Sequence, residues 1–100
     1  MEQLLNLING ELRPALGGTT IDVYAPATGR VIAQAPDSDE RDVQAAVDAA
    51  TKAFPVWNGM GVEGRSNALL RLADAIEQDM DGFVADESRD NGKPLSLARR

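Results

Sequence analysis

Residues 36–57, PDSDERDVQAAVDAATKAFPVW, mark the point where the hydrophobic pattern of the chain changes its period. Six apolar side chains recur there at i, i+3, i+4, i+7, i+10 and i+11, which is one face of a helix. They are Val43, Ala46, Val47, Ala50, Ala53 and Phe54. Ser38 or Asp39 can cap the helix, and the acidic first turn suits the helix dipole. The pattern predicts a helix over about 39–54 that ends at Pro55.

Upstream of this helix the apolar residues alternate, which is the period of a half-buried strand. The segments TTIDVYAP (19–26) and RVIAQAP (30–36) alternate on either side of a turn in which Gly29 supplies a positive φ. Nearer the N-terminus, LNLINGEL (5–12) contains Asn9-Gly10, a strong hairpin signal. We expect two or three short strands within about 5–36, forming a small antiparallel ribbon that needs a surface to lie on.

Downstream, VWNGMGVEG (56–64) reads as a glycine-containing connector, followed by a longer helix over about 63–89. Gly82 lies inside that helix and costs about 1 kcal/mol relative to alanine. Asp90-Asn91-Gly92 is predicted to cap its end, and Pro94 to start another helix at the N1 position. The continuous apolar face of the long helix is formed by Leu69, Leu72, Ala73, Ile76, Met80, Phe83 and Val84.

Composition narrows the class of protein. The chain has 100 residues and is 43% hydrophobic, but only 4% aromatic, so the core it can build alone is thin. Sixteen acidic against ten basic residues give a net charge of −6, which disfavours nucleic acid and anionic membrane as partners. With no signal-peptide pattern and no apolar stretch of membrane-spanning length, we expect a cytoplasmic protein.

Catalytic signals are weak within these residues. The chain contains no cysteine and no histidine, so it has no thiolate nucleophile and lacks the commonest general base. Glu87 and Asp90 lie three apart and could form an acid–base pair, but solvated or cap-adjacent acids are the favoured interpretation. The glycines of NGMGVEG fit neither a P-loop nor a dinucleotide fingerprint. Trp57 and Lys93 are interpreted as a packing anchor and a solvated lysine.

Five landmarks taken together are more specific than any one of them. INGE, APATGRVIAQAP, DVQAAVDAATKAFPVW, RSNALLRLADAIEQDMDGFVADES and DNGKPL follow one another along nearly the whole chain. In this order they resemble the N-terminal segment of the NAD(P)-dependent aldehyde dehydrogenase superfamily, nearest to its betaine-aldehyde and muconic-semialdehyde types. The resemblance implies an α/β fold in which residues 1–100 form the β-ribbon and first helices of a doubly wound cofactor-binding domain.

The resemblance also implies a function for the parent protein. Relatives oxidise an aldehyde to a carboxylic acid with NAD or NADP, through a cysteine thiohemiacetal and a thioester that a glutamate-activated water hydrolyses. They are commonly dimers or tetramers. The catalytic cysteine, the glutamate and the nucleotide-binding residues lie further along the polypeptide, so this chain alone is expected to be inactive. A last helix without a closing signal by Arg100 favours a piece of a longer polypeptide, with a frayed natural end as the alternative.

One site is partly implied by the same resemblance. Some relatives similar to betaine aldehyde dehydrogenase hold a monovalent cation, K⁺ or Na⁺. The matching positions here are the backbone oxygens of Val23 and Tyr24 and the carboxylate of Asp90. YAP replaces the NP-type turn of the family at this point, and Asp90 as a plain cap acid is the alternative. Arg65 matches an arginine that starts the long helix in relatives, and we interpret it as structural.

A different class of function is also compatible with the residues, namely a free-standing acidic module that offers a helix face to a partner. The discriminating feature is the stripe Leu69, Leu72, Ile76 and Phe83. A piece of a larger domain should expose this stripe, whereas a stand-alone domain should bury it.

Overall fold

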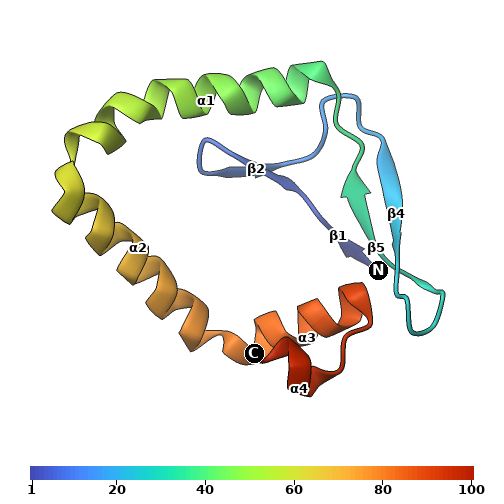
Figure 1. Cartoon of the computed structure of the whole chain (residues 1–100). Coiled ribbons are helices and arrows are strands. Elements are labelled where there is room, and N and C mark those ends of the chain that lie inside the picture. Colours follow the sequence, from blue (N-terminus) through green and yellow to red (C-terminus); the bar gives the residue numbers. More distant parts are fainter. The chain divides into compact units, whose positions relative to one another are not determined.

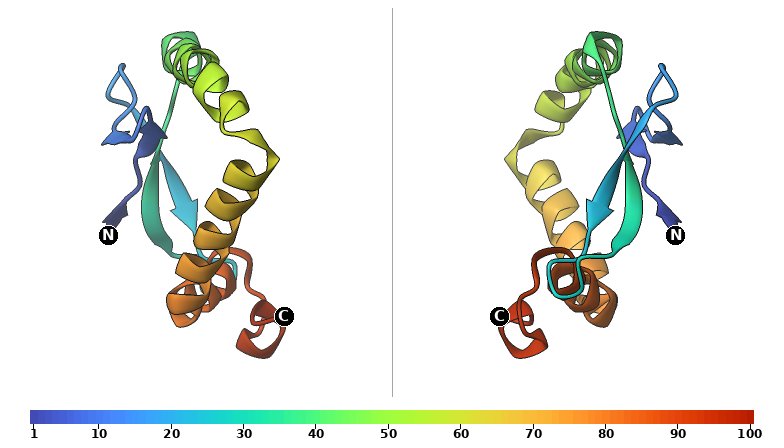
Figure 2. Two further views of the ribbon diagram at one scale, coloured as in Figure 1. Left: turned by 90° about the vertical axis from the view of Figure 1, so that its left-hand side faces the viewer. Right: turned by 90° about the vertical axis from the view of Figure 1, so that its right-hand side faces the viewer.

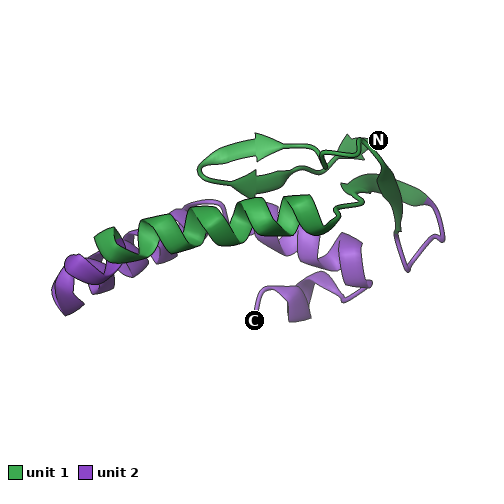
Figure 3. Ribbon diagram, turned by 90° about the horizontal axis from the view of Figure 1, so that it is seen from above, with its two compact units in different colours: residues 1–24, 31–56 green, residues 25–30, 57–100 purple.

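The structure is a computed structural model that describes residues 1–100, and it divides into two compact units. Unit 1 comprises residues 1–24 and 31–56, and unit 2 comprises residues 25–30 and 57–100 (Figure 3). The five short strands belong to unit 1, and the turn that joins the last two belongs to unit 2.

The strands of unit 1 form two separate sheets. β1 (Glu2–Gln3), β5 (Val31–Pro36) and β4 (Thr20–Tyr24) form a three-stranded sheet in the order β1-β5-β4, and β4 and β5 run side by side in every view (Figures 1 and 2). β2 (Asn6–Ile8) and β3 (Glu11–Arg13) form a two-stranded hairpin. The predicted antiparallel pairing is confirmed for β4–β5 and for β2–β3. The prediction missed β1, which pairs with β5 in parallel.

The two predicted turns, at Asn9-Gly10 in unit 1 and at Gly29 in unit 2, have the expected backbone conformation. Asn9 has a φ of 54° and Gly10 a φ of 76°, the positive pair that a two-residue hairpin turn with right-handed strand twist requires. Gly29 has a φ of 72°, and Ala25 N–H donates to the Arg30 carbonyl across the same turn at 2.8 Å. Both turn predictions are confirmed.

Four helices follow the strands: α1 (Glu40–Gly59), α2 (Gly61–Gln78), α3 (Met80–Asn91) and α4 (Leu95–Ala98). The predicted stop at Pro55 is wrong, because Pro55 lies inside α1. A proline ring holds a φ that a helix can use, so the chain loses one hydrogen bond there and continues. The break comes at Gly61, whose φ of 74° a residue with a side chain rarely adopts, and Met60 alone separates the two helices. The predicted connector over 56–64 is therefore wrong.

The long helix predicted over 63–89 is also divided, at Asp79. This residue has a φ of −115° and a ψ of 32°, which ends α2 and begins α3. A Cβ built on Gly82 would lie 2.6 Å from Oδ1 of Asp79, so the missing side chain leaves room for the carboxylate at this bend. Gly82 thus has a local steric role in addition to its cost in helix propensity.

The end of α3 agrees with its sequence signal. Gly92 has a φ of 77° and its N–H donates to the Ser88 carbonyl at 2.9 Å, which confirms the predicted left-handed C-cap. Pro94 is the N-cap of α4 and not its N1 residue, one position from the prediction. α4 lies beside α3 (Figure 2), and Arg99 of its C-cap makes an ion pair with Asp81 at 2.9 Å.

The hydrophobic core is small, as the composition predicts. Buried apolar side chains are confined to Ile8, Ala15 and Ala33 in unit 1 and to Ala25 and Val84 in unit 2. The stripe Leu69, Leu72, Ile76 and Phe83 is between 37% and 58% exposed. Exposure of this stripe is what we expect of part of a larger domain.

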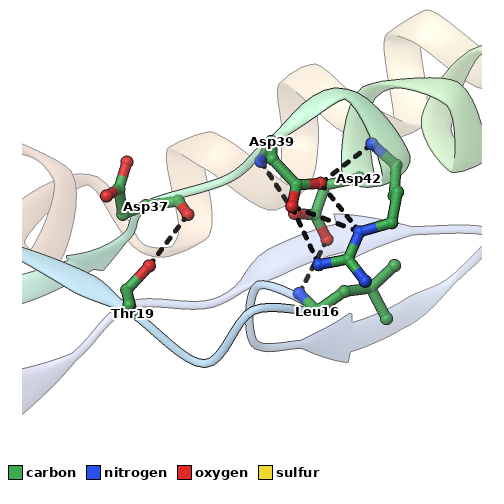
Figure 4. A network of polar contacts seen from close by, with 6 residues as sticks. Leu16, Thr19, Asp37, Asp39 and Asp42 are labelled. Carbon is green, nitrogen blue, oxygen red and sulfur yellow. Dashed lines mark hydrogen bonds and ion pairs between the residues drawn. The ribbon is translucent and has the colours of Figure 1, made fainter.

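A polar contact takes the place of apolar packing at the start of α1. Asp42 is only 3% exposed, and its carboxylate accepts hydrogen bonds from Leu16 N–H and from Asp39 N–H, both at 3.0 Å (Figure 4). Asp39 in turn accepts from Arg41 N–H at 2.9 Å. This is a reciprocal capping box, which joins the loop after β3 to the first turn of α1. Ser38, the other predicted cap, instead accepts from Asn6 Nδ2 at 2.8 Å.

The same corner contains an ion pair. Arg41 Nη2 lies 2.8 Å from Asp39 Oδ2. Hydrogen bonding from the Arg41 side chain, followed by that from its backbone N–H, holds the pKa of Asp39 below its ordinary value. The side-chain hydrogen bond to Asp39 likewise raises the pKa of Arg41. Both side chains are about half exposed, so this ion pair adds little to the stability of the capping box.

We predict that Asp42→Ala releases the loop after β3 from α1. The substitution leaves two backbone N–H groups without acceptors, and each such loss costs about 1–3 kcal/mol. Hydrogen exchange should show protection of the Leu16 and Asp39 amides falling at least ~10-fold. Asp48→Ala is the control, because Asp48 is exposed and accepts only from Gln44 at 2.7 Å. Equal loss of protection in both variants would contradict the role of Asp42.

The Asp39–Arg41 pair should make helix content depend on pH in a defined direction. Because the folded pKa of Asp39 is lowered, its contribution is complete above the ordinary aspartate pKa of ~3.9 and disappears as the pH falls through the lowered value. Asparagine also caps helices well, so Asp39→Asn removes mainly the charge. Thermal melts followed by circular dichroism should give a higher Tm for the wild type than for Asp39→Asn at neutral pH. In strong acid the two Tm values should be equal. A separation of the same size at both pH values would refute the assignment.

Candidate functional site

Val23 and Tyr24, two of the three residues predicted to bind a cation, lie at an irregularity of the sheet. β4 is an edge strand, and its register with β5 shifts between these residues, since Val23 pairs with Ala33 and Tyr24 with Val31. The residue that this shift leaves without a partner is Ile32, so the bulge itself lies on β5. Because β4 is an edge strand, the backbone groups on its outer side lie outside the ladder, where a carbonyl oxygen can bind a cation. Val23 is half-buried and Tyr24 is 58% exposed. The local backbone is thus compatible with the predicted carbonyl ligands.

Asp90, the third predicted ligand, lies in the last turn of α3 and belongs to unit 2. Its side chain is exposed, and its carboxylate makes neither a hydrogen bond nor an ion pair. The carboxylate of Asp90 therefore takes no part in the cap of α3. The cation site formed by Val23, Tyr24 and Asp90 stays a prediction.

The residues around Asp90 form a tightly hydrogen-bonded corner between α3 and α4. Asn91 Nδ2 donates to Glu87 Oε1 at 2.6 Å, and Lys93 N–H donates to Asn91 Oδ1 at 2.8 Å. Ser88 Oγ donates to the Lys93 carbonyl at 2.6 Å. Lys93 Nζ also lies 3.6 Å from Glu87 Oε1. Glu87 is therefore engaged by two neighbours, which favours the structural interpretation of Glu87 and Asp90 over an acid–base pair.

Gly92 brings a second segment of unit 2 to this corner. A Cβ on Gly92 would lie 3.4 Å from Cβ of Pro26, in the turn of residues 25–30 that follows β4. With its φ of 77°, Gly92 is fixed both by its backbone conformation and by this close approach. The sequence signal for a C-cap identified Gly92 but gave no indication of its contact with Pro26.

The glycines of NGMGVEG do not form a loop that could hold a phosphate. Gly59 ends α1 and Gly64 lies within α2, where a Cβ would approach Cβ of Met60 to 3.0 Å. Arg65 Nη1 donates to the Asn58 carbonyl at 3.1 Å and so caps the end of α1. Arg65 makes no ion pair, in agreement with its structural interpretation.

The remaining features of the chain add no chemistry. An open groove in unit 1 lies between the β2–β3 hairpin and α1, with mostly apolar walls. No cluster of three or more acidic side chains is placed to hold a metal ion. None of the helices combines the length and the apolar character that crossing a membrane requires. Asp42 is the residue that sequence reasoning missed, and the signal that could have found it is the Asp-x-x-Asp spacing of residues 39–42.

Comparison with known proteins places this arrangement in one family. The family model described as "Aldehyde dehydrogenase family" matches residues 13–100. The chain is 43% identical to 2-aminomuconic semialdehyde dehydrogenase of Mus musculus over 96 residues, which is 96% of this chain and 19% of that protein. The chain therefore spans about a fifth of the length of the curated relatives it matches.

Solved structures give the same result. PnpE from Pseudomonas sp. WBC-3 matches with a TM-score of 0.92 and 37% identity, and a PnpE structure in complex with nicotinamide adenine dinucleotide matches with the same two values. An NAD-dependent aldehyde dehydrogenase from Sinorhizobium meliloti matches with a TM-score of 0.92 and 33% identity. Each match covers 99% of this chain and 20% of the other. The predicted α/β fold class is confirmed, and the chain belongs to the aldehyde dehydrogenase family.

Proposed function

We propose that this chain is the N-terminal part of an NAD(P)-dependent aldehyde dehydrogenase, an oxidoreductase that converts a small aldehyde to a carboxylic acid. The observation that carries the proposal is agreement over almost the whole chain with family members at 37–43% identity, together with a TM-score of 0.92. The rival interpretation as a free-standing interaction module has no comparable support.

These residues supply scaffold and no catalytic group. They contain no cysteine for nucleophilic attack on an aldehyde. No strand is followed by a glycine-rich helix start, so they do not offer the phosphate-binding geometry that a dinucleotide requires. The chain instead contributes a small mixed sheet and four helices whose exposed apolar side chains suit packing within a larger domain. On this proposal the 100 residues alone are inactive.

Substrate, assembly and location are part of the same proposal. The identity to 2-aminomuconic semialdehyde dehydrogenase favours a semialdehyde as substrate. We place the whole enzyme in the cytoplasm as a homodimer or homotetramer, using NAD or NADP.

The activity is tested on the full-length protein that carries this chain. Purified protein should reduce NAD⁺ or NADP⁺ only when an aldehyde is added, followed as absorbance of the reduced nicotinamide. The panel should include acetaldehyde, betaine aldehyde and a carboxylate-bearing semialdehyde. The 100-residue chain under the same conditions should give no signal above the blank. Absence of aldehyde-dependent reduction with either cofactor would reject the proposal.

We further propose that the full-length protein binds K⁺ or Na⁺ through the backbone oxygens of Val23 and Tyr24 and the carboxylate of Asp90. The supporting observations are the position of Val23 and Tyr24 on the edge strand β4, opposite a bulge in β5, and the unpaired, exposed carboxylate of Asp90. Hard oxygen ligands with a single carboxylate suit a monovalent cation.

The cation site predicts a melting temperature that depends on the ion. Replacing choline chloride by KCl or NaCl at equal ionic strength should raise Tm by a few degrees, because a ligand that binds the folded state stabilises it. Asp90→Asn should abolish this difference. Asp74→Asn, at an exposed acid of α2, is the matched control and should preserve it. If Asp90→Asn keeps the full shift, Asp90 is not a ligand.

A further inference from the structure

Three Asn-Gly dipeptides occur in the chain, at Asn9-Gly10, Asn58-Gly59 and Asn91-Gly92. In such a dipeptide the backbone nitrogen of the glycine can attack the side-chain amide carbon of the asparagine, because glycine has no Cβ to obstruct the approach. The attack requires a glycine N–H that is free to lose its proton and an asparagine side chain that is free to turn back onto its own main chain. The structure separates the three dipeptides by these two requirements.

At Asn91-Gly92 every group that must move is held. Gly92 N–H donates to the Ser88 carbonyl at 2.9 Å. Asn91 uses both ends of its amide, with Nδ2 bonded to Glu87 at 2.6 Å and Oδ1 accepting from Lys93 N–H at 2.8 Å. Three hydrogen bonds must therefore break before reaction.

At Asn58-Gly59 the helix provides the protection. Both residues lie in α1, where helical backbone hydrogen bonding engages the N–H groups. The peptide group that joins them is also held from its other side, because the Asn58 carbonyl accepts from Arg65 Nη1 at 3.1 Å. The reacting nitrogen belongs to this same peptide group.

Asn9-Gly10 differs from both other dipeptides in its glycine N–H group, and from Asn91-Gly92 also in its asparagine side chain. The two residues are the exposed tip of the β2–β3 hairpin, and neither the Gly10 N–H nor the Asn9 side chain has a hydrogen-bond partner. No heavy atom outside the immediate chain lies within 4 Å of the position that a Cβ on Gly10 would occupy. Solvent and base therefore reach the reacting atoms directly.

We propose that Asn9 is a site of spontaneous deamidation to aspartate and isoaspartate, selected by the fold from three sequence-equivalent dipeptides. The Gly10 nitrogen gives its proton to base and forms a bond to Cγ of Asn9. The bond from Cγ to Nδ2 breaks, ammonia leaves with a proton, and a cyclic succinimide remains. Water then opens the ring at either carbonyl. Opening at the side-chain carbonyl restores the normal main chain with an aspartate, and opening at the main-chain carbonyl gives isoaspartate.

Conversion at this position changes the hairpin. Isoaspartate inserts a methylene into the main chain of a two-residue turn whose positive φ values and Ile8–Glu11 pairing depend on its length. Ile8 is only 6% exposed, so a change in register would move a buried side chain. The modification thus alters local structure as well as adding a negative charge.

The test follows the three dipeptides in one sample of the full chain. Native full-length protein that carries this chain is incubated in mildly alkaline buffer and digested with a glutamate-specific protease, which places Asn9, Asn58 and Asn91 in three separate peptides that begin at residues 3, 41 and 88. Mass spectrometry measures the mass gain of amide-to-acid conversion. Fragment ions separate Asn9 from Asn6, and protein isoaspartate methyltransferase with labelled S-adenosylmethionine reports isoaspartate. We expect Asn9 to convert at least ~10-fold faster than the other two.

The same chain in concentrated urea is the matched control. Because all three asparagines precede glycine, their rates should become similar once the hydrogen bonds are lost. The proposal is overturned if Asn58 or Asn91 converts as fast as Asn9 in the native chain. It is equally overturned if Asn9 stays an amide in the native chain while it reacts in urea.

Discussion

The buried carboxylate of Asp42 is the contact on which the arrangement of unit 1 depends. It accepts the N–H of Leu16, from the loop that follows the β2–β3 hairpin, and the N–H of Asp39, at the start of α1. The apolar side chains buried in this unit are few, and two of the three are alanines, which bury little area. Two charge-assisted hydrogen bonds to this buried carboxylate therefore hold the loop and the helix together where apolar packing is sparse.

A different constraint organises unit 2, where the backbone conformation of glycine and the contact with proline define the fold more than the burial of apolar side chains does. Gly61 and Gly92 take positive φ values that end one helix path and begin another. The corner at Gly92 is closed by hydrogen bonds among polar side chains and by the close approach of Pro26. The long apolar stripe of α2 and α3 is exposed, so no large core orients these helices. Their directions are set by the local backbone geometry at these glycines and by the hydrogen bonds of the corner.

Membership of the aldehyde dehydrogenase family explains why a chain with little chemistry of its own has so defined a backbone. The segment matches its relatives over nearly its full length but only a fifth of theirs. Its capping box and helix corners position elements of secondary structure and supply no catalytic group. The one reactive feature that the backbone exposes, Asn9-Gly10, results from the same turn geometry that forms the hairpin.

The sequence by itself determined the local elements with strong and short-range signals. Asn9-Gly10, Gly29 and Gly92 specified their turns because glycine and asparagine adopt a positive φ at lower cost than other residues, and the hydrophobic periods located α1 and the α2–α3 region. The order of landmarks was enough to indicate the family. Tertiary structure alone decided what depends on contacts between distant residues: the parallel β1–β5 pairing, the burial of Asp42 under Leu16, and the packing of Gly92 on Pro26. It also decided that Pro55 would continue a helix and that Asp79 would divide one, because each residue type is compatible with either outcome until its surroundings are fixed.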